Sequence, residues 1–455
     1  MSAIRPVLCL ALLVLHFPFL ACRSAAAPAA SPASFSRTVL PNGLTVIVKP
    51  EESAGIVAIE VFIKAGASVE RESTAGIGNL VAHTLLASTR NKRAETVAAV
   101  ADEVGGNLQT EWHPDYTEIK AITTTSEFDR AMSLLGDILN NANFEAQWVE
   151  RARLEILSGM ATGGDDIFEA AYDETRQKLY RDNPYHRPPM GYARVIKSLT
   201  PDNLLQFYRK YYVPNNIVIS IVGDVTEQHA LDRARKAFAG TSAHEMPKQR
   251  PIPYEDIPES KAEVLERPIS AAYFMFGFLA PGVASEDYPS AQVGAAALGM
   301  GKGSRMFRNL REKKGLAYDL GALYLPLANQ SHIIAYLITD AYRRTFPTLS
   351  VQMLLSEVKK AMLEEVARLQ NEPLSAAELE RAKRYTIGAY ALRHQRLRDR
   401  AYYLGWLEAI GLGAEHDIQF AAKIEAVTPT DVQRIAKKYL KNYVVTIVLP
   451  GNSEK

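Results

Sequence analysis

The stretch GIGNLVAHTLLAST, residues 76–89, has the apolar character of a buried helix and carries one histidine, His83, near its middle. A second histidine four residues earlier would lie on the same helical face, and two imidazoles at that spacing can bind one metal ion. Asn79 occupies that position instead. The helix therefore offers one strong metal ligand where a metal-dependent enzyme needs several.

The overall composition is that of a globular protein. The 455 residues include 52 Lys and Arg against 51 Asp and Glu, and 47% are hydrophobic. A chain of this length can form more than one core. Its nearly neutral charge gives no indication of nucleic acid or of an anionic membrane surface as a partner.

Residues 1–34 are expected to be an export signal and a flexible tether that lie outside the fold. Arg5 precedes an apolar run that is short for a membrane span, and small residues follow it. Both cysteines, Cys9 and Cys22, lie in this segment, so the mature protein has no disulfide and no thiolate metal ligand. The sequence FLAC, ending at Cys22, resembles a bacterial lipobox, and cleavage near residues 25–27 without lipidation is the alternative. We therefore expect export to the bacterial periplasm, and membrane attachment only in the first of these two alternatives, through a lipid on Cys22.

Two segments of the chain match without a gap at an offset of 228 residues (427 against 199). They are LTPDNLLQFYRKYYVPNNIVISIVG, residues 199–223, and VTPTDVQRIAKKYLKNYVVTIVLPG, residues 427–451. Each begins with Thr-Pro, which is typical of a helix N-terminus, and ends in a β-branched strand followed by Gly. Residues 57–72 and 271–288 match more loosely. Two related halves are the simplest explanation.

The fold is expected to be α+β, with homologous domains at residues 35–242 and 263–455. The connecting segment, 243–262, is polar, rich in Pro and without a hydrophobic period, as is typical of a linker. Each domain is expected to hold a mostly antiparallel sheet covered by helices, with long helical stretches at 347–369 and 375–410. One large irregular domain is the alternative.

The mature chain resembles the pitrilysin/insulinase family of zinc peptidases along essentially its whole length. Four segments carry the resemblance: RTVLPNGLTVIVKPEES, KAGASVERESTAGIGNLVAHTLL, VGGNLQTEWHPDYTEIKAITTTSEFDRAMSLLGDIL and GSRMFRNLREKKGLAY. In the shorter members, such as the subunits of the mitochondrial processing peptidase, two homologous domains form half of a clam-like chamber. The length of this chain corresponds to one such half.

The family's zinc site is an H-x-x-E-H motif on a helix, completed by a distant Glu, and this chain departs from it at most positions. The resemblance places the first His at Asn79, the general-base Glu at Ala82, the second His at His83 and the distant Glu at Gly159. One ligand of three remains and the base is missing. The resemblance therefore implies a chain that binds no zinc or other cofactor of its own and is inactive alone.

Nearby carboxylates are poor substitutes for the missing groups. Glu155 lies four residues before Gly159, about 6 Å along the helix axis. Asp165 and Asp166 follow a Gly-Gly pair in a predicted loop. None of them supplies a base at Ala82, so a packed or interfacial histidine is the favoured interpretation of His83.

The second half keeps residues that the family uses in catalysis. The resemblance gives Arg311 and Tyr318, in SRMFRNLREKKGLAY, the role of hydrogen-bonding the substrate carbonyl as it becomes a tetrahedral oxyanion. In the alternative interpretation Arg311 belongs to a solvated basic face with Arg308, Lys313 and Lys314, and Tyr318 begins a strand.

Residues 105–125 are where the resemblance places the edge strand to which an extended peptide substrate adds. An interior strand is the alternative. Trp112 and His113 then either cover a closed chamber or contact the substrate.

Three functions are compatible with the sequence. In the favoured one the chain is the non-catalytic subunit of an exported heterodimeric zinc metallopeptidase: a homologous subunit holds the zinc, and this chain binds peptide and supplies Arg311 and Tyr318. The second is a peptide-binding or scaffold protein of the same fold with no role in hydrolysis. The third is a free-standing peptidase, which is disfavoured because no second H-x-x-E-H, nucleophile elbow or paired-carboxylate signature occurs.

Overall fold

The computed structural model describes residues 35–162, 166–246, 252–340 and 351–451. The predicted export segment, with both cysteines, and Asp165 lie outside the described residues. Residues Phe35–Lys455 belong to one compact unit. The predicted domain limits at 242 and 263 stay predictions.

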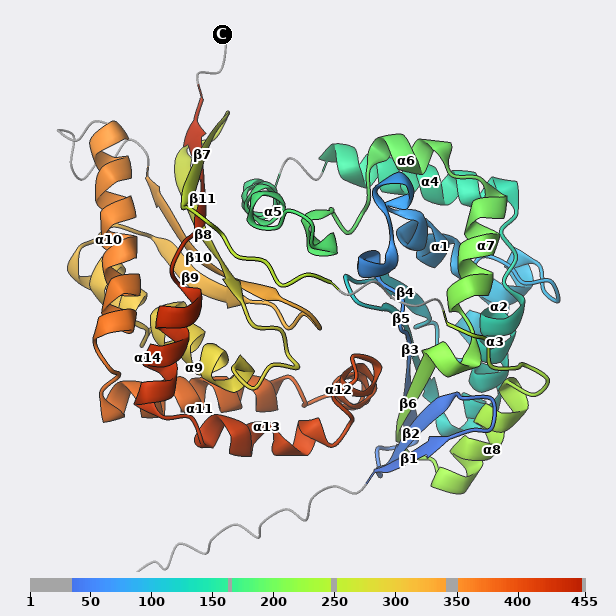
Figure 1. The fold of residues 1–455 in the computed structure, drawn as a ribbon. Helices are drawn as coiled ribbons and strands as arrows, with labels where there is room; N and C mark the ends of the chain where they lie inside the picture. Colours follow the sequence, from blue (N-terminus) through green and yellow to red (C-terminus); the bar gives the residue numbers. More distant parts are fainter. Residues whose placement is uncertain (1–34, 163–165, 247–251, 341–350, 452–455) are drawn as a thin grey trace, which may run out of the picture. The chain divides into compact units, whose positions relative to one another are not determined.

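The first sheet has six strands in the order β1-β2-β6-β3-β5-β4 (Figure 1). Neighbouring strands are antiparallel except β2 and β6, which run parallel. The central strand β3 is buried along seven of its eight residues, so both of its faces are covered. The strands are β1 (Ser36–Val39), β2 (Thr45–Pro50), β3 (Ile56–Ile63), β4 (Gln109–Trp112), β5 (Thr117–Thr124) and β6 (Ile217–Gly223).

The second sheet repeats this arrangement in the order β7-β11-β8-β10-β9. When β7, β11, β8, β10 and β9 are matched to β2, β6, β3, β5 and β4, the single parallel pair falls at the same place in both sheets. The predicted α+β class is confirmed. The strands are β7 (Lys261–Arg267), β8 (Ala271–Ala280), β9 (Asp319–Tyr324), β10 (Ser331–Asp340) and β11 (Val444–Pro450).

The matching segments found in the sequence form the same unit twice, a helix followed by a strand. Helix α7 (Pro201–Tyr211) precedes β6, and α14 (Pro429–Tyr439) precedes β11. The hydroxyls of Thr200 and Thr428 accept hydrogen bonds from backbone N–H groups three residues later, at 3.3 and 3.2 Å. Threonine followed by proline therefore begins both helices, as predicted.

Helices cover the outer face of each sheet. In the first half α1 packs near β4, α3 near β5 and α8 near β2; in the second, α9 packs near β9 and α14 near β8. Among the described residues, none of the helices combines the length and the apolar character needed to cross a bilayer. The remaining helices are α1 (Ile77–Leu85), α2 (Ala94–Glu103), α3 (Phe128–Asn141), α4 (Ala146–Thr162), α6 (Ala193–Ser198), α8 (Glu227–Ala237), α9 (Tyr288–Gly299), α10 (Val351–Asn371), α11 (Ala376–Leu392) and α13 (His416–Glu425).

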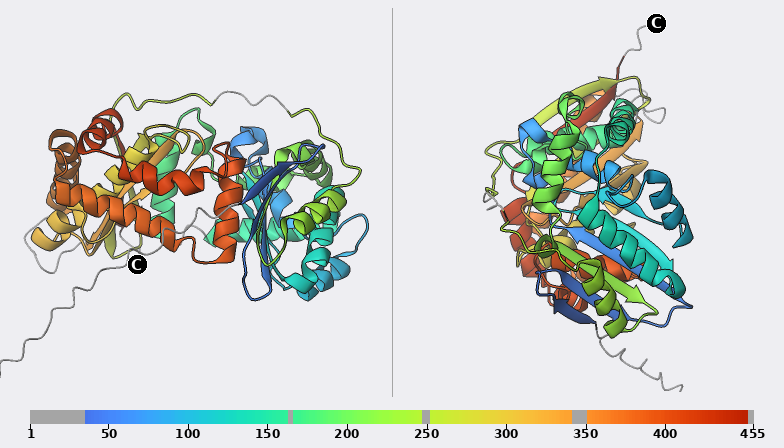
Figure 2. Two further views of the ribbon diagram at one scale, coloured as in Figure 1. Left: turned by 90° about the horizontal axis from the view of Figure 1, so that it is seen from below. Right: turned by 90° about the vertical axis from the view of Figure 1, so that its right-hand side faces the viewer.

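One helix of each half packs on the sheet of the other half. Helix α5 (Ile167–Leu179) lies against β8 and β11, and α12 (Leu397–Ala409) lies against β3 and β6. Because β8 and β11 correspond to β3 and β6, the exchange is reciprocal. In the left view of Figure 2 the orange-red α12 stands on one side of the blue strands, and teal and green helices stand on the other.

Close packing and hydrogen bonds hold α12 on the first sheet. Gly405 makes the closest approach: a Cβ at this position would lie 2.5 Å from a ring carbon of Phe62 and 3.0 Å from Cβ of Ser220. The hydroxyls of Tyr402 and Tyr116 are 2.6 Å apart. A glycine is needed here because a larger residue would lift the helix from the sheet.

A buried histidine ties α5 to the second sheet. His332 on β10 has Nε2 2.8 Å from the Tyr172 hydroxyl and Nδ1 2.9 Å from the Tyr180 hydroxyl. Tyr180 donates its own hydrogen to the carbonyl of Gln330, at 3.0 Å. The ring therefore carries its hydrogen on Nδ1 and accepts from Tyr172 at Nε2. Burial lowers the pKa of His332 to about 3, so the ring is neutral at physiological pH.

The predicted helical stretch at 375–410 is wrong as a single helix, because α11 ends at Leu392 and α12 begins at Leu397. His394 lies in the break, with Nδ1 2.8 Å from the carbonyl of Tyr390 and Nε2 2.8 Å from Asp417 Oδ1. The break lets α12 leave its own half. The stretch predicted at 347–369 overlaps α10, and residues 347–350 lie outside the described part of the chain.

Candidate functional site

The helix that carries the degenerate motif, α1, is capped by a buried carboxylate. Its N-cap, Gly76, has a left-handed conformation with φ of 102° and no side chain to accept hydrogen bonds. Glu70 supplies the capping side chain instead: its two carboxylate oxygens accept hydrogen bonds from the N–H groups of Gly76 and Gly78, at 2.8 Å each. Burial raises the pKa of Glu70 to about 7. The sequence reasoning did not single out this residue.

The motif positions on α1 make ordinary structural contacts. The buried Asn79 side chain donates to the carbonyl of Met190 at 3.4 Å. His83 is exposed, and its Nδ1 lies 3.0 Å from the backbone carbonyl of Asn79. A carbonyl only accepts, so Nδ1 carries a hydrogen. The carbonyl of Ala82 accepts from the Thr110 hydroxyl at 2.8 Å, which joins α1 to β4.

Met190 fills the space beside Gly159, the position of the family's distant ligand. A Cβ built on Gly159 would lie 3.4 Å from Met190 Cε. Since the carbonyl of Met190 also accepts from Asn79, one residue contacts two of the positions at which the resemblance predicts metal ligands. No signal in the sequence identifies Met190, because it lies 31 residues after Gly159 and belongs to neither α1 nor α4.

These residues do not fit a zinc ion. An amide, a methyl group and a glycine stand at the positions of two ligands and the base, and only His83 offers a strong ligand atom. The described carboxylates nearby have other partners. Glu155 Oε1 lies 3.1 Å from Nε of Arg151 on the same helix. Asp166 begins α5, where it accepts from the N–H groups of residues 168 and 169 at 3.0 and 3.2 Å.

Residues 105–125 contain both alternatives: β4 lies at the edge of the first sheet, and β5 lies inside it, between β3 and β4. Trp112, at the end of β4, packs on α1 so closely that a Cβ on Gly78 would overlap the indole ring. The ring also lies edge-on to Phe207, with centroids 6.2 Å apart. His113 follows the strand and has Nε2 3.0 Å from Glu118 Oε2. Trp112 therefore supports the edge strand from behind.

Arg311 and Tyr318 are both exposed in the second half. Arg311 lies in η7 (Phe307–Lys313), a π-helix, with its guanidinium 5.2 Å from the centroid of the Phe307 ring. Tyr318 precedes β9, is 54% exposed and donates its backbone N–H to Ile338 at 3.2 Å. Partial burial raises the pKa of Tyr318, so its hydroxyl stays protonated at neutral pH. Over residues 35–162, 166–246, 252–340 and 351–451, neither the guanidinium nor the hydroxyl has a hydrogen-bond or ion-pair partner.

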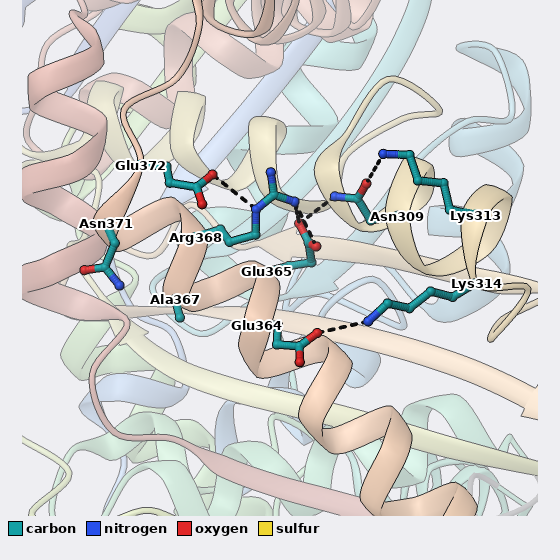
Figure 3. A pocket seen from close by; sticks show the side chains of 9 residues that line it. All are labelled: Asn309, Lys313, Lys314, Glu364, Glu365, Ala367, Arg368, Asn371 and Glu372. Carbon is teal, nitrogen blue, oxygen red and sulfur yellow. Dashed lines mark hydrogen bonds and ion pairs between the residues drawn. The ribbon is translucent and has the colours of Figure 1, made fainter.

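The lysines beside Arg311 are engaged differently. A hollow of about 480 Å³ separates η7 from α10, and Figure 3 shows the side chains that cross it. Lys314 Nζ lies 2.9 Å from Glu364, Asn309 donates to Glu365 at 2.9 Å, and Lys313 donates to Asn309 at 3.0 Å. These contacts fix the π-helix on α10. The basic face suggested as an alternative therefore consists partly of bonded lysines, from which Arg311 differs.

Comparison with known proteins identifies similar chains along most of this length. Residues 45–191 match the family model described as insulinase (peptidase family M16), and residues 198–385 match the one described as peptidase M16 inactive domain. An uncharacterized zinc protease of Mycobacterium bovis is 27% identical over 440 residues, which cover 95% of this chain and 97% of that protein. One from Streptomyces coelicolor is 25% identical over 414 residues, covering 89% and 87%.

Solved structures share the fold. A protease from Helicobacter pylori superposes with a TM-score of 0.81 at 20% identity, over 92% of this chain and 100% of that one. A structure from Pseudomonas fluorescens, described as peptidase M16 inactive domain, also gives a TM-score of 0.81, at 21% identity and over 93% and 99% of the two chains. The two-sheet architecture is thus that of known peptidase-like proteins.

Proposed function

Because the chain belongs to the insulinase family of peptidases, family M16, we propose that it is the non-catalytic subunit of a heterodimeric zinc peptidase. The resemblance inferred from the sequence is thereby confirmed, and the chain is a peptidase homologue. A homologous subunit with an intact H-x-x-E-H motif is the proposed partner and holder of the zinc. One contrast carries the proposal: Gly159 and Ala82 offer no ligand and no base, whereas the guanidinium of Arg311 and the hydroxyl of Tyr318 are exposed and have no polar partner in the described part of the chain.

The proposed contribution of this chain is stabilisation of negative charge. A guanidinium is permanently cationic, and a protonated phenol is a strong donor. Aimed at the carbonyl oxygen of a peptide held in the partner's site, Arg311 and Tyr318 would stabilise the charge that develops on that oxygen. The contact of Arg311 with the Phe307 ring limits the orientations of the guanidinium.

The proposed substrate is an extended peptide. Strand β4 lies at the sheet edge, so one side of its backbone is available for pairing with another strand. Such pairing depends on backbone groups and sets few requirements on side chains. The packing of Trp112 on α1 would keep the edge in place.

The proposed location is the bacterial periplasm, after cleavage of the segment within residues 1–34. Whether Cys22 is lipidated can be tested by labelling cells with a fatty acid. If the lipobox interpretation holds, the wild type takes up the label and Cys22→Ser does not. Full-length, unprocessed protein in the cytoplasm would contradict export by either route.

A peptide-binding or scaffold protein without a role in hydrolysis is the second candidate. The observation that favours it is the stacking of Arg311 on Phe307, which gives the guanidinium a structural contact that needs no substrate.

Mixing the purified chain with a homologous zinc-bearing subunit tests the proposal. We expect peptide hydrolysis by the complex and none by this chain alone. Arg311→Ala or Tyr318→Phe should lower the turnover of the assembled complex by roughly ten- to a thousandfold, the scale for loss of one oxyanion donor. Arg308→Ala, which removes an exposed arginine from the same π-helix, is the matched control and should leave turnover unchanged.

Equal turnover with wild-type and doubly substituted chains, in a complex verified by size, would refute the catalytic contribution and favour the scaffold. Hydrolysis by this chain alone would refute the non-catalytic assignment.

A further inference from the structure

Away from the degenerate motif, three metal-ligating side chains converge on the hairpin formed by β4 and β5. Glu111, His113 and Glu118 each offer one ligand atom, and these atoms lie within 4.8 Å of one another. His113 Nε2 is 3.0 Å from Glu118 Oε2 and 3.5 Å from Glu111 Oε2. Ligands at about 2.0–2.1 Å from a tetrahedral zinc ion are about 3.3 Å apart. The spacing of the ligand atoms therefore suits a single ion.

The strand register explains why a cation is favoured at this point. Glu111 and Glu118 are direct partners across the antiparallel pair, where two like charges repel each other. Lys120 bonds the Oε1 atom of Glu111 and lies 3.7 Å from Oε1 of Glu118. The other oxygen of each carboxylate, Oε2, lies near Nε2 of His113.

A fully buried carboxyl group, that of Glu60, lies behind Glu118. Glu60 on β3 is 0% exposed and in register with Lys120, and its carboxyl lies against that of Glu118. Arg398 on α12 approaches Glu60 Oε1 at 3.3 Å. Within the described residues, Glu60 Oε2 and Glu118 Oε1 are buried without a hydrogen-bond partner. A cation bound beside Glu118 would offer this buried carboxylate a further partner.

This cluster is separate from the motif on α1. Side chains alternate along β4, so Glu111 points away from the face on which Thr110 and Trp112 contact α1. The side chain of Glu111 is 47% exposed, that of His113 27% and that of Glu118 2%. One carboxylate is therefore fixed in the sheet, and the other two ligands border solvent from which an ion can enter.

We propose that Glu111, His113 and Glu118 bind one divalent transition-metal ion of the zinc class. One imidazole with two carboxylates suits zinc or cobalt better than magnesium or calcium, which prefer oxygen ligands alone. Three protein ligands leave at least one position for water. The ion would replace the repulsion between the two strands by a shared bond and so fix the edge strand β4.

Metal titration of the purified, processed chain tests this site. After removal of metals with a chelator, we expect one equivalent of Co²⁺ to bind with a visible absorption band, and Zn²⁺ to displace it. His113→Gln should weaken binding by at least about a hundredfold, because loss of even an outer-shell partner costs about ten- to a hundredfold. His83→Gln is the matched control and should leave the affinity unchanged.

Lys120→Met separates a metal site from a network of ion pairs. The ammonium group competes with a metal ion for the same two carboxylates, so we expect its removal to raise the Zn²⁺ affinity by about tenfold or more. Thermal unfolding of each variant checks that it is folded. Three outcomes would overturn the site: less than one equivalent bound by the wild type, binding that depends on His83 and not on His113, or a lower affinity in Lys120→Met.

Discussion

The terminal methyl group of Met190 lies beside Gly159, so that a Cβ built on the glycine would be 3.4 Å from Met190 Cε. The carbonyl of the same methionine accepts a hydrogen bond from Asn79. Met190 therefore contacts two positions at which the resemblance to the zinc peptidases predicts metal ligands. Restoring the ligands alone would place a glutamate side chain next to this methionine.

We predict that Asn79→His, Ala82→Glu and Gly159→Glu together restore zinc binding at the motif, and that Met190→Ala strengthens it. The Met190 methyl group is at ordinary contact distance and the residue is 40% exposed, so displacing it should cost less than about 1 kcal/mol, which corresponds to at most about fivefold in affinity. The measurement is Zn²⁺ affinity in a His113→Gln background, so that the hairpin site does not contribute. Addition of His83→Gln should abolish the restored binding. Equal affinities with and without Met190→Ala would show that the methionine does not obstruct the site.

We predict opposite effects of alanine at two helical glycines. Gly405→Ala on α12 should destabilise the protein by about 1–3 kcal/mol, because its Cβ would lie 2.5 Å from the Phe62 ring. Gly388→Ala on α11, where nothing lies within 4 Å, should stabilise it by about 0.5–1 kcal/mol. Urea unfolding measures both. A gain of stability of equal size in both variants would mean that helix propensity, and not contact with the first sheet, decides the effect.

We predict that Glu70 makes stability depend on pH. Burial raises the pKa of Glu70 from 4.5 to about 7, so the folded protein holds this proton more tightly than the unfolded chain does. Its contribution to stability is therefore complete below pH 4.5 and is lost as the pH rises through 7. Relative to Glu70→Gln, which does not titrate, the wild type should lose up to about 3 kcal/mol of unfolding free energy between pH 4.5 and pH 8. Parallel stability curves for the two proteins would contradict the raised pKa.

The sequence is sufficient to predict those elements whose signals are local. Thr200 and Thr428 predict the starts of two equivalent helices. A threonine hydroxyl before proline can accept a hydrogen bond from a backbone N–H in the first turn of a helix. The matching strands after them follow from runs of β-branched residues. The α+β class follows from this repetition.

The exchange of α5 and α12 could not be predicted in the same way. An apolar face on a helix indicates that the helix packs against another element. It does not indicate which of two equivalent sheets that element is. Only the glycine at 405 hints at a close contact, and it gives no partner. The break at His394, which redirects α12, depends on a bond to Asp417 from a later helix.

The hairpin cluster shows a similar limit. Glu111 and Glu118 are seven residues apart in EWHPDYTE, and they become neighbours only through the strand register. The sequence alone predicts only that His113 covers a chamber or contacts the substrate, because the register of β4 and β5 is not evident from it. An alternation of charged residues on both sides of a Pro-Asp turn is the signal that would have indicated it.

The reciprocal packing of α5 and α12 has an evolutionary consequence. A half-length ancestor with only one sheet would have carried a helix with no partner in its own fold and a sheet face left bare. In a dimer of that ancestor, each copy could have packed its helix on the bare sheet face of the other copy, as in domain swapping. Joining two such copies in one chain would keep this exchange of helices intact and would allow each half to diverge.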